Sequence, residues 1–412
     1  MKVGYAQNII TPSLDKPVWL AGFENNRRAE TIHDDLYVRA LATQDDKSTL
    51  VLVALDLIGF FRQDVYEVLE TLKVSETFRV LSPHVVIASV HPHHGPDTMG
   101  LWGPDDKTSG VDLDYMSALK EKIAATILSS LSDLKPASVK TTSVHVPGLA
   151  KNARNPEILD DELTLLQFLN AKRENCPLVT FFNFPCHPEV LWMDNPHITA
   201  DYVGYLRDEV EKRTGAPCIF FAGGLGGMMT PDVKDHSFEE AEFMGKKLAE
   251  EGLKALQITD HGQQTMVDGQ SSIVSIQKKE IKAKLTNPLY KIAFWRKLLP
   301  DVRDKNGYIH SEVNLIKIGD LWLATIPGEL LPNLGLSLKA QLLDASRGAG
   351  VAGIIGLAND ELGYILPVED FKYPWNPFKP GKHYEETNSI GKGVAPAVIS
   401  ALDELLEGER HV

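Results

Sequence analysis

Residues Thr49 to Leu57 read Thr-Leu-Val-Leu-Val-Ala-Leu-Asp-Leu, and residues Leu178 to Phe184 read Leu-Val-Thr-Phe-Phe-Asn-Phe. Both are short apolar runs rich in β-branched or aromatic residues, a composition typical of strands. Successive side chains of a strand point to opposite faces, so an uninterrupted apolar run indicates a strand that is covered on both faces. These two stretches therefore predict a buried sheet inside a layered fold.

The rest of the chain alternates between runs of this kind and longer segments with helical spacing. Six more strands are predicted at Val85–Val90, Leu163–Leu169, Cys218–Ala222, Val313–Ile318, Leu321–Ile326 and Val351–Leu357. Helices are predicted at Asp112–Leu134, Tyr202–Thr214, Phe238–Leu256, Leu331–Ser346 and Ala395–Leu406. Strands interleaved with helices predict an α/β layered fold, with a mixed β-sheet flanked by helices.

We expect one large catalytic domain over residues 1–412, with residues 257–306 as a candidate insertion or lid. That range has a polar part and then a basic amphipathic part, and a solvated excursion on the surface is its simpler interpretation. Residues Phe371–Tyr384 are rich in aromatic residues and proline, which predicts a long ordered loop.

The composition excludes several classes of function. Lys and Arg total 42 and Asp and Glu total 56, for a net charge of −14, and an acidic surface repels nucleic-acid phosphates. Three widely spaced cysteines do not make a disulfide framework. The N-terminal residues lack the apolar core of a signal peptide, and no apolar run approaches membrane-spanning length. We expect a cytoplasmic protein without nucleic-acid partners or membrane insertion. We make no prediction of its oligomeric state.

The stretch Val90-His91-Pro92-His93-His94-Gly95-Pro96 follows directly on a predicted strand. If the strand continues, His91 and His93 project to one side and His94 to the other. Two imidazoles at the end of a strand suit a metal ion such as zinc. The alternative is a turn whose histidines only form hydrogen bonds.

Two further segments follow predicted strands. In Phe184-Pro185-Cys186-His187-Pro188-Glu189, two prolines hold His187 in a rigid backbone, which suits a fixed ligand or a structural histidine. Cys186 points away from His187 in an extended chain, and we expect it in the core. In Thr325-Ile326-Pro327-Gly328-Glu329, the carboxylate of Glu329 is expected at the first turn of a helix, as a ligand or a partner of the helix dipole.

These motifs resemble those of the neutral/alkaline non-lysosomal ceramidases. The histidine stretch at 91–96 is similar to that family's Thr-His-Thr-His-Ser-Gly-Pro, and Pro327-Gly328-Glu329 matches its Pro-Gly-Glu. Further matches, in the same order along the chain, lie at Ile32–Ala40, Asn183–Pro188, Gly356–Tyr364 and His383–Thr387. The resemblance therefore extends over nearly the whole chain.

The resemblance implies a hydrolase that cleaves an N-acyl amide by attack of metal-bound water. It implies one Zn²⁺ per chain, held by His91, His187, Glu329 and Tyr364. It also implies catalytic roles for three residues: His93 beside the metal, Tyr364 near the developing oxyanion, and Arg154 near the reacting carbonyl. Asp56, which closes a predicted strand, either orients a ligand histidine or faces water.

Three features depart from the family pattern. Met228 and Thr230 replace an acidic residue and a serine, and Glu361 replaces the first tyrosine of the Gly-Leu-x-Asn-x-Tyr-x-x-Tyr motif. The glycines before Met228 indicate a tight turn or a close approach of the backbone. We expect a single-domain protein without the family's C-terminal β-sandwich domain, and a smaller, more polar amide than a membrane lipid. The aromatic residues Tyr373, Trp375 and Phe378 are candidates for the wall of the substrate pocket.

Other functions remain open at this stage. The same zinc site serves an esterase or lactonase, so the expected partner is a small-molecule amide or ester. A non-catalytic homologue that only binds a ligand is the alternative from a different class. A serine hydrolase is disfavoured, because the sequence has no Gly-x-Ser-x-Gly elbow.

Overall fold

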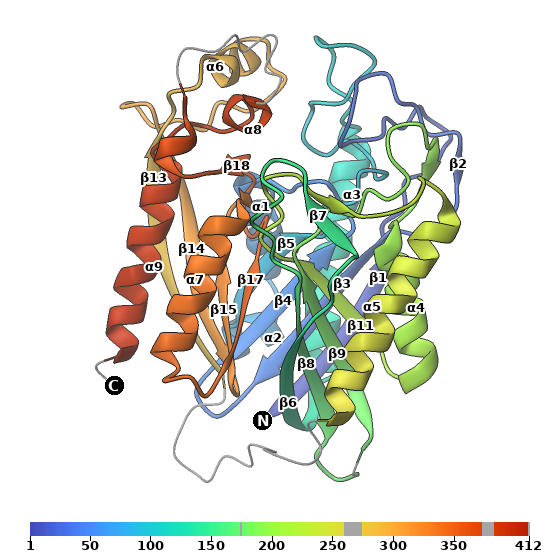
Figure 1. Cartoon of the computed structure of the whole chain (residues 1–412), viewed down its shortest axis with the longest axis vertical. Coiled ribbons are helices and arrows are strands. Elements are labelled where there is room, and N and C mark those ends of the chain that lie inside the picture. The colour runs from blue at the N-terminus through green and yellow to red at the C-terminus, as the bar shows by residue number, and fades with distance from the viewer. Residues whose placement is uncertain (174, 259–273, 373–382, 411–412) are drawn as a thin grey trace.

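The computed structural model describes residues 1–173, 175–258, 274–372 and 383–410, and its main feature is a large mixed sheet (Figure 1). The strand order is β11-β9-β8-β6-β1-β3-β4-β5. Its strands are β1 (Lys2–Ile9), β3 (Tyr37–Gln44), β4 (Thr49–Leu55), β5 (His84–Ser89), β6 (Lys135–His145), β8 (Glu162–Asn170), β9 (Pro177–Phe184) and β11 (Cys218–Ala222). The pairs β4–β5 and β9–β11 are parallel and the other pairs are antiparallel.

A second sheet has the strand order β13-β14-β15-β17. Its strands are β13 (Val274–Lys284), β14 (Tyr308–Ile318), β15 (Leu321–Thr325) and β17 (Val351–Ile355). Three short pairs lie outside the two sheets: β2 (Thr31–Ile32) with β10 (His197–Ile198), β7 (Ala150–Asn152) with β12 (Met229–Pro231), and β16 (Glu329–Leu330) with β18 (Tyr364–Ile365).

The helices cover the outer faces of the two sheets. On the eight-stranded sheet lie α1 (Arg62–Leu72), α2 (Glu76–Leu81), α3 (Leu113–Ser132), α4 (Tyr202–Thr214) and α5 (Phe238–Ile258). On the second sheet lie α7 (Pro332–Ala345) and α9 (Val394–Arg410). Strand β17 contacts β6, β8 and β9, so the two sheets face each other between the helix layers (Figure 1). Near β18, at one end of the molecule, lie α6 (Pro288–Trp295), η2 (Val368–Asp370) and α8 (Tyr384–Thr387).

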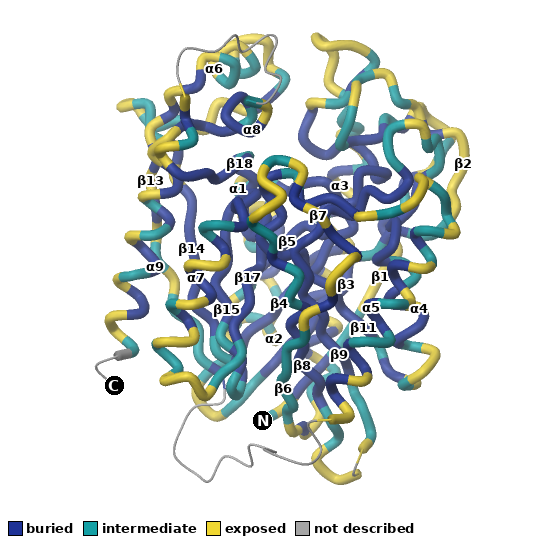
Figure 2. Tube along the Cα trace, in the orientation of Figure 1, coloured by how far each residue is buried: buried dark blue, intermediate teal, exposed yellow. Residues whose placement is uncertain are grey.

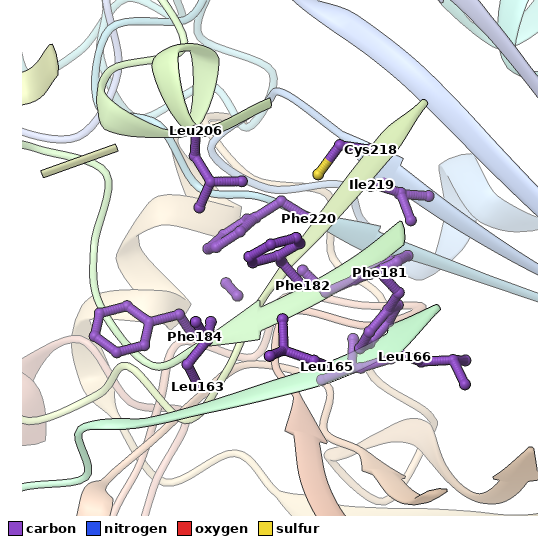
Figure 3. Packing of buried hydrophobic residues seen from close by; sticks show 14 of the residues in the cluster. Leu163, Leu165, Leu166, Phe181, Phe182, Phe184, Leu206, Cys218, Ile219 and Phe220 are labelled. Carbon is purple, nitrogen blue, oxygen red and sulfur yellow. The ribbon is translucent and has the colours of Figure 1, made fainter. Parts of the chain in front are cut away.

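The largest part of the core joins the eight-stranded sheet to α4 and α5. In Figure 3, Leu206 of α4 points toward the rings of Phe182 and Phe220 on neighbouring strands. Gly252 of α5 allows a close approach, because a Cβ atom there would lie 2.6 Å from the ring of Phe182. Most strands, such as β3, β4, β8, β9 and β11, are buried along most of their length, whereas β1, β6, β13 and the outer helix surfaces are partly exposed (Figure 2).

The predicted fold class is confirmed, and the predicted elements form close to their expected positions. Cys218–Ala222 and Tyr202–Thr214 have the predicted bounds, and the others differ by a few residues at their ends. Of the strands in the two sheets, the sequence analysis missed β1, β3, β6 and β13, and β1, β6 and β13 contain many polar or exposed residues. It also missed helices α1, α2 and α6. Strand β13 lies inside the range expected as an insertion or lid, and it pairs with β14 along its whole length. The number of domains stays a prediction.

The loop expected at Phe371–Tyr384 falls mostly at residues 373–382, outside the described residues, and so do the three aromatic residues proposed to wall the pocket. Across the described ranges, no helix is both long and apolar enough to cross a bilayer.

Candidate metal centre

His91 turns its Nε2 atom into the molecule through an unusual backbone conformation. Strand β5 ends at Ser89, and His91 has a positive φ of 72°, so the extended geometry expected from the sequence is wrong here. The backbone N–H of His91 donates to the carbonyl of Leu57 at 3.0 Å, and its Nδ1 donates to the carbonyl of Ile58. Because Nδ1 carries the proton, Nε2 has a lone pair available for a ligand.

His187 shows the same arrangement on the loop after β9. Its Nδ1 lies 2.8 Å from the carbonyl oxygen of Met229, and its Nε2 lies 3.1 Å from Oε2 of Glu329. Its backbone N–H donates to the same carbonyl of Met229 at 2.8 Å. Ligand histidines in metalloproteins typically donate the second ring N–H to a carbonyl or carboxylate, which fixes their orientation.

His93 completes a group of three buried histidines. Its ring lies 5.1 Å from that of His91 and 5.3 Å from that of His187, centroid to centroid. One ring nitrogen of each of the three lies within 4.8 Å of the others, a spacing that can hold a metal ion. His94 does not join them, since its Nε2 pairs with the carbonyl of Trp192 at 2.8 Å.

Two of the nitrogen atoms in this group lack ordinary partners. Within the described part of the chain, neither ring nitrogen of His93 has a partner with hydrogen-bond geometry. Its Nδ1 lies only 3.0 Å from Oε2 of Glu189, so the contact has the distance of a hydrogen bond without its directionality. Buried polar atoms without partners are costly, and a cation between the rings, or a water molecule bound to it, would give one nitrogen of His93 a partner.

Glu329 and Tyr364 reach the centre together because their strands are paired. They are direct partners in the parallel pair β16–β18, and Glu329 precedes α7 rather than starting it as expected. The carboxylate lies between two rings, with Oε1 3.9 Å from Nε2 of His91 and Oε2 near His187. The hydroxyl of Tyr364 lies 3.8 Å from the sulfur of Met228.

The segment that carries Tyr364 is anchored to the eight-stranded sheet by Asn359. Its side-chain oxygen accepts from the N–H of Ile87 at 2.8 Å, and its Nδ2 donates to Glu312 at 2.8 Å. The neighbouring Ala358 forms an isolated bridge with Ala88 of β5. These contacts explain physically why an asparagine stands in this motif.

The buried histidines and carboxylates of the centre influence one another's pKa values. Burial lowers the pKa of His91 to about 3. Burial also lowers the pKa of His187, but the Glu189 and Glu329 carboxylates outweigh it and raise that pKa to about 9. Burial opposes ionisation of Glu189, but His93 and His187 outweigh it and hold the pKa of Glu189 at about 2. Without a metal, one imidazolium therefore lies between two carboxylates, an environment that favours a divalent cation.

Glu189 is the site residue that the sequence analysis missed. It is buried with a side-chain exposure of 0% and stands two residues after His187. The available signal was its place beside a rigid Pro-x-His-Pro turn at the end of a buried strand. An acidic residue in so apolar a neighbourhood needs a positively charged or hydrogen-bonding partner.

The centre opens into a cavity of about 310 Å³, which we call the metal-centre cavity. Its wall includes His91, His93, Glu189, Glu329 and Tyr364, together with Phe23, Trp192, Met228, Glu361 and Tyr384. His187 lies at the inner side of the group, 1% exposed. The volume lies near the lower end of the range of roughly 300–1,000 Å³ for small-molecule pockets.

Arg154 lies apart from this wall within the described residues. Its guanidinium pairs with Glu385 and Glu386 of α8 and lies 3.4 Å from Asp370. Burial lowers the pKa of Arg154, but the two glutamates outweigh it and raise that pKa. Arg154 therefore ties the loop after β7 to the helix that carries Tyr384.

Two further expectations concern residues near the centre. Asp56 neither orients a ligand histidine nor faces water, because its carboxylate forms a two-point pair with Arg207 at 2.7 and 2.8 Å. Cys186 lies in the hydrophobic core as expected, and burial raises the pKa of its thiol.

The glycine-rich turn that departs from the family pattern lies against the strand that carries Glu329. A Cβ atom on Gly226 would lie 2.6 Å from the carbonyl oxygen of Glu329, so this position requires glycine. Gly227 and Met228 both have positive φ, at 73° and 54°. Both expected reasons for glycine here, a tight turn and a close approach, are present.

A sequence model of the neutral/alkaline non-lysosomal ceramidases, N-terminal domain, matches residues 2–237. The match covers more than half of the 412 residues, and the chain belongs to this family. The assignment supports a hydrolase that acts on amides, and the three histidines are able to hold a metal ion. The recognition of this family from the sequence motifs is confirmed.

Solved structures agree on the fold. Neutral ceramidase from Pseudomonas aeruginosa is 18% identical and superposes with a TM-score of 0.77, covering 100% of this chain and 75% of that chain. A ceramidase in complex with C2 is 16% identical, with a TM-score of 0.74 and coverages of 99% and 74%. A comparison with curated protein sequences gave no significant match.

Proposed function

We propose that this protein is a zinc-dependent hydrolase that cleaves an N-acyl amide bond. The observation that carries the proposal is the convergence of His91, His187 and Glu329. Both histidines direct Nε2 toward the carboxylate while their Nδ1 atoms are held by backbone carbonyls. We assign these three residues and Tyr364 as the ligands of one zinc ion per chain.

The residues present fit zinc chemically, because imidazole nitrogen and carboxylate oxygen are ordinary zinc ligands. When bound, zinc supplies Lewis acidity and lowers the pKa of water to roughly 7. The buried walls around the group exclude bulk solvent, which strengthens the electrostatic interactions inside.

His93, Glu189 and Tyr364 act on protons and charge in this proposal. His93 holds or moves a proton at Nε2, and Glu189 beside its Nδ1 stabilises the cationic form of the ring. Tyr364 donates its hydroxyl hydrogen to the oxygen of the scissile carbonyl as negative charge develops there. Arg154 contributes as a positioning residue, because its contacts fix the helix of Tyr384, whose ring lies 5.9 Å from that of Tyr364.

For the substrate, we propose an amide that is smaller and more polar than a membrane lipid, processed in the cytoplasm. The metal-centre cavity supports a small ligand through its volume of about 310 Å³. Its carboxylates and tyrosines support a substrate that carries polar groups next to the reacting bond.

The direct test is a panel of N-acyl amides with matched esters and lactones, assayed with zinc-loaded protein and with protein treated with a chelator. The proposal predicts amide hydrolysis that is lost on chelation and restored by zinc. If only the esters or only the lactones are hydrolysed, the protein is an esterase or a lactonase and not an amidase. Zinc binding without turnover of any acyl compound would favour a non-catalytic, ligand-binding homologue.

A further inference from the structure

The three buried histidines of the metal centre are held in different ways. His91 and His187 are each fixed by a hydrogen bond from Nδ1 to a backbone carbonyl. His93 has no such bond in the described part of the chain, where neither of its ring nitrogens has a partner with hydrogen-bond geometry. The ring of His93 is therefore positioned mainly by packing. Residues 21–27, which lie between β1 and β2, supply much of that packing.

Gly22 lies directly against the ring of His93. A Cβ atom on Gly22 would lie 2.3 Å from Cγ of His93 and 2.8 Å from its Cδ2, so no larger residue fits unless the ring or the segment moves. Gly22 also has a positive φ of 99°, which favours glycine independently of this contact. The next residue, Phe23, has its ring T-shaped to that of His93, with centroids 4.7 Å apart. Two consecutive residues thus pack against one imidazole.

Arg27 holds this segment against the turn that carries His93. Its guanidinium donates to the carbonyl oxygens of Ala21 at 2.9 Å and of His93 at 3.2 Å. It also donates to the carbonyl of Met193 at 2.9 Å, and no carboxylate forms an ion pair with it among the described residues. The rigid fork of five N–H donors allows arginine to bind several carbonyls at once, which lysine does not reproduce.

Further hydrogen bonds fix the segment on either side of Gly22. The N–H of Ala21 donates to the carbonyl of Gly95 at 3.0 Å. The indole N–H of Trp102 donates to the carbonyl of Phe23 at 3.1 Å. Gly22 and Phe23 also line the metal-centre cavity, so the segment borders the space proposed for the substrate.

We propose that residues 21–27 form a clamp that positions the imidazole of His93 for proton transfer, with Gly22 and Arg27 as its positioning residues. Gly22 acts through its contact with the ring, and Arg27 acts through the carbonyl of the same histidine. The inference rests on the proposed function, in which His93 holds or moves a proton at Nε2. A misplacement of about 1 Å can cost about 100-fold in rate, so the clamp affects the reaction without holding the metal.

The test is a double-mutant cycle between Gly22→Ala and His93→Ala in the full chain. With saturating zinc, Gly22→Ala lowers kcat about 10- to 100-fold in the wild-type background, while zinc affinity stays within a few-fold of wild type. In the His93→Ala background it has little further effect, because the residue through which it acts is gone. Gly148→Ala is the matched control, since Gly148 has a φ of 81° and a Cβ atom there meets nothing within 4 Å. The control adds backbone strain without a clash.

Thermal unfolding of the same variants, without metal or substrate, tests the clamp independently of the proposed function. Gly22→Ala lowers the melting temperature more than Gly148→Ala does, because it adds a clash to the backbone strain. Most of this excess disappears in the His93→Ala background, where the clash is absent. Failure of the proposed function is seen as absent turnover in every preparation. Failure of the clamp is seen as the same loss of stability in both backgrounds.

Arg27→Met and Arg27→Lys test the second positioning residue and do not depend on the folding of Gly22→Ala. Arg27→Met lowers kcat about 10-fold with zinc retained, and Arg27→Lys, which keeps the charge but not the fork, recovers part of the loss. The proposal is overturned if folded Gly22→Ala keeps kcat within a few-fold of wild type, or lowers it equally in both backgrounds. It is also overturned if folded Arg27→Met is as active as wild type.

Discussion

Glu329 and Tyr364 are direct partners in a two-stranded parallel pair, although 34 positions separate them in the sequence numbering. The pairing places a carboxylate and a phenol side by side at the end of the two large sheets. The carboxylate contacts His187, and the phenol lines the same cavity as His91. A short backbone ladder thus sets the geometry of half of the proposed ligand set.

Removing the charge of Glu329 should weaken zinc binding. Glu329→Gln keeps the size of the side chain but loses the anion that contacts His187 at 3.1 Å. Replacing even an indirect partner of a metal ligand typically costs about 10- to 100-fold in affinity, so we expect a loss of at least ~10-fold. Competition with a coloured chelator measures this loss, and an unchanged affinity would remove Glu329 from the ligand set.

Tyr364→Phe should lower the rate even when the variant is saturated with zinc, and because Tyr364 is also a proposed ligand it should weaken zinc binding. The ring still packs, but the hydroxyl that faces the cavity is lost. Loss of one donor to a developing oxyanion costs about 100- to 1,000-fold in kcat, which is the expected effect here. Steady-state kinetics on a substrate found in the acyl panel measures it, with zinc content determined on the same sample. A kcat within a few-fold of wild type would contradict the assigned role.

Glu189→Gln should lower the rate without loss of zinc, because Glu189 acts on His93 and not as a metal ligand. The carboxylate lies 3.0 Å from Nδ1 of His93 and favours the protonated ring. Without this charge the pKa of His93 falls further, and the pH–rate profile shifts accordingly. We expect kcat to fall about 10- to 100-fold with zinc retained, as for other partners of site histidines. A purely structural role would lower thermal stability without moving the profile.

Zinc affinity should rise with pH. His187 has a pKa raised to about 9 by Glu189 and Glu329, so below that pH its imidazole holds a proton that zinc must displace. The release of one proton makes the apparent affinity rise about tenfold per pH unit and level off near pH 9. Zinc titrations at several pH values, in buffers of different ionisation enthalpy, count the proton. An affinity that is flat between pH 6 and 8 would contradict this prediction.

The buried pair Asp56–Arg207 should support the fold and not the metal. Asp56→Asn leaves a buried guanidinium without its anion, which costs about 3–5 kcal/mol in the free energy of unfolding. Asp46→Asn, at an exposed position, is the control and should change stability by less than about 0.5 kcal/mol. Urea unfolding measures both. Loss of zinc from folded Asp56→Asn would restore the ligand-orienting role first considered for this residue.

Much of the fold was predictable because its strands are buried on both faces. Runs such as 178–184 and 218–222 consist mostly of apolar residues, so composition alone identified them. Strands β6 and β13 have largely polar or half-buried residues, and they are held by pairing with β8 and β14 across intervening loops. Local patterns carry no information about such pairing.

The candidate site was predictable where the motif residues are themselves common metal ligands. His91, His93 and His187 were recognised as metal-binding types, and the structure brings them together. The extended geometry assumed for His91 was wrong, because its positive φ depends on hydrogen bonds to residues 57 and 58. Glu189 was missed because its role depends on His93, which lies on a different loop.

The central claim is that His91, His187, Glu329 and Tyr364 hold one zinc ion, and metal content tests it most directly. Elemental analysis is performed side by side on wild type, on His187→Ala, and on His145→Ala, whose exposed ring contacts Asp161. The account predicts about one zinc per chain in wild type and His145→Ala, and little in His187→Ala. A wild-type protein that contains no zinc and does not take it up on reloading would contradict the account.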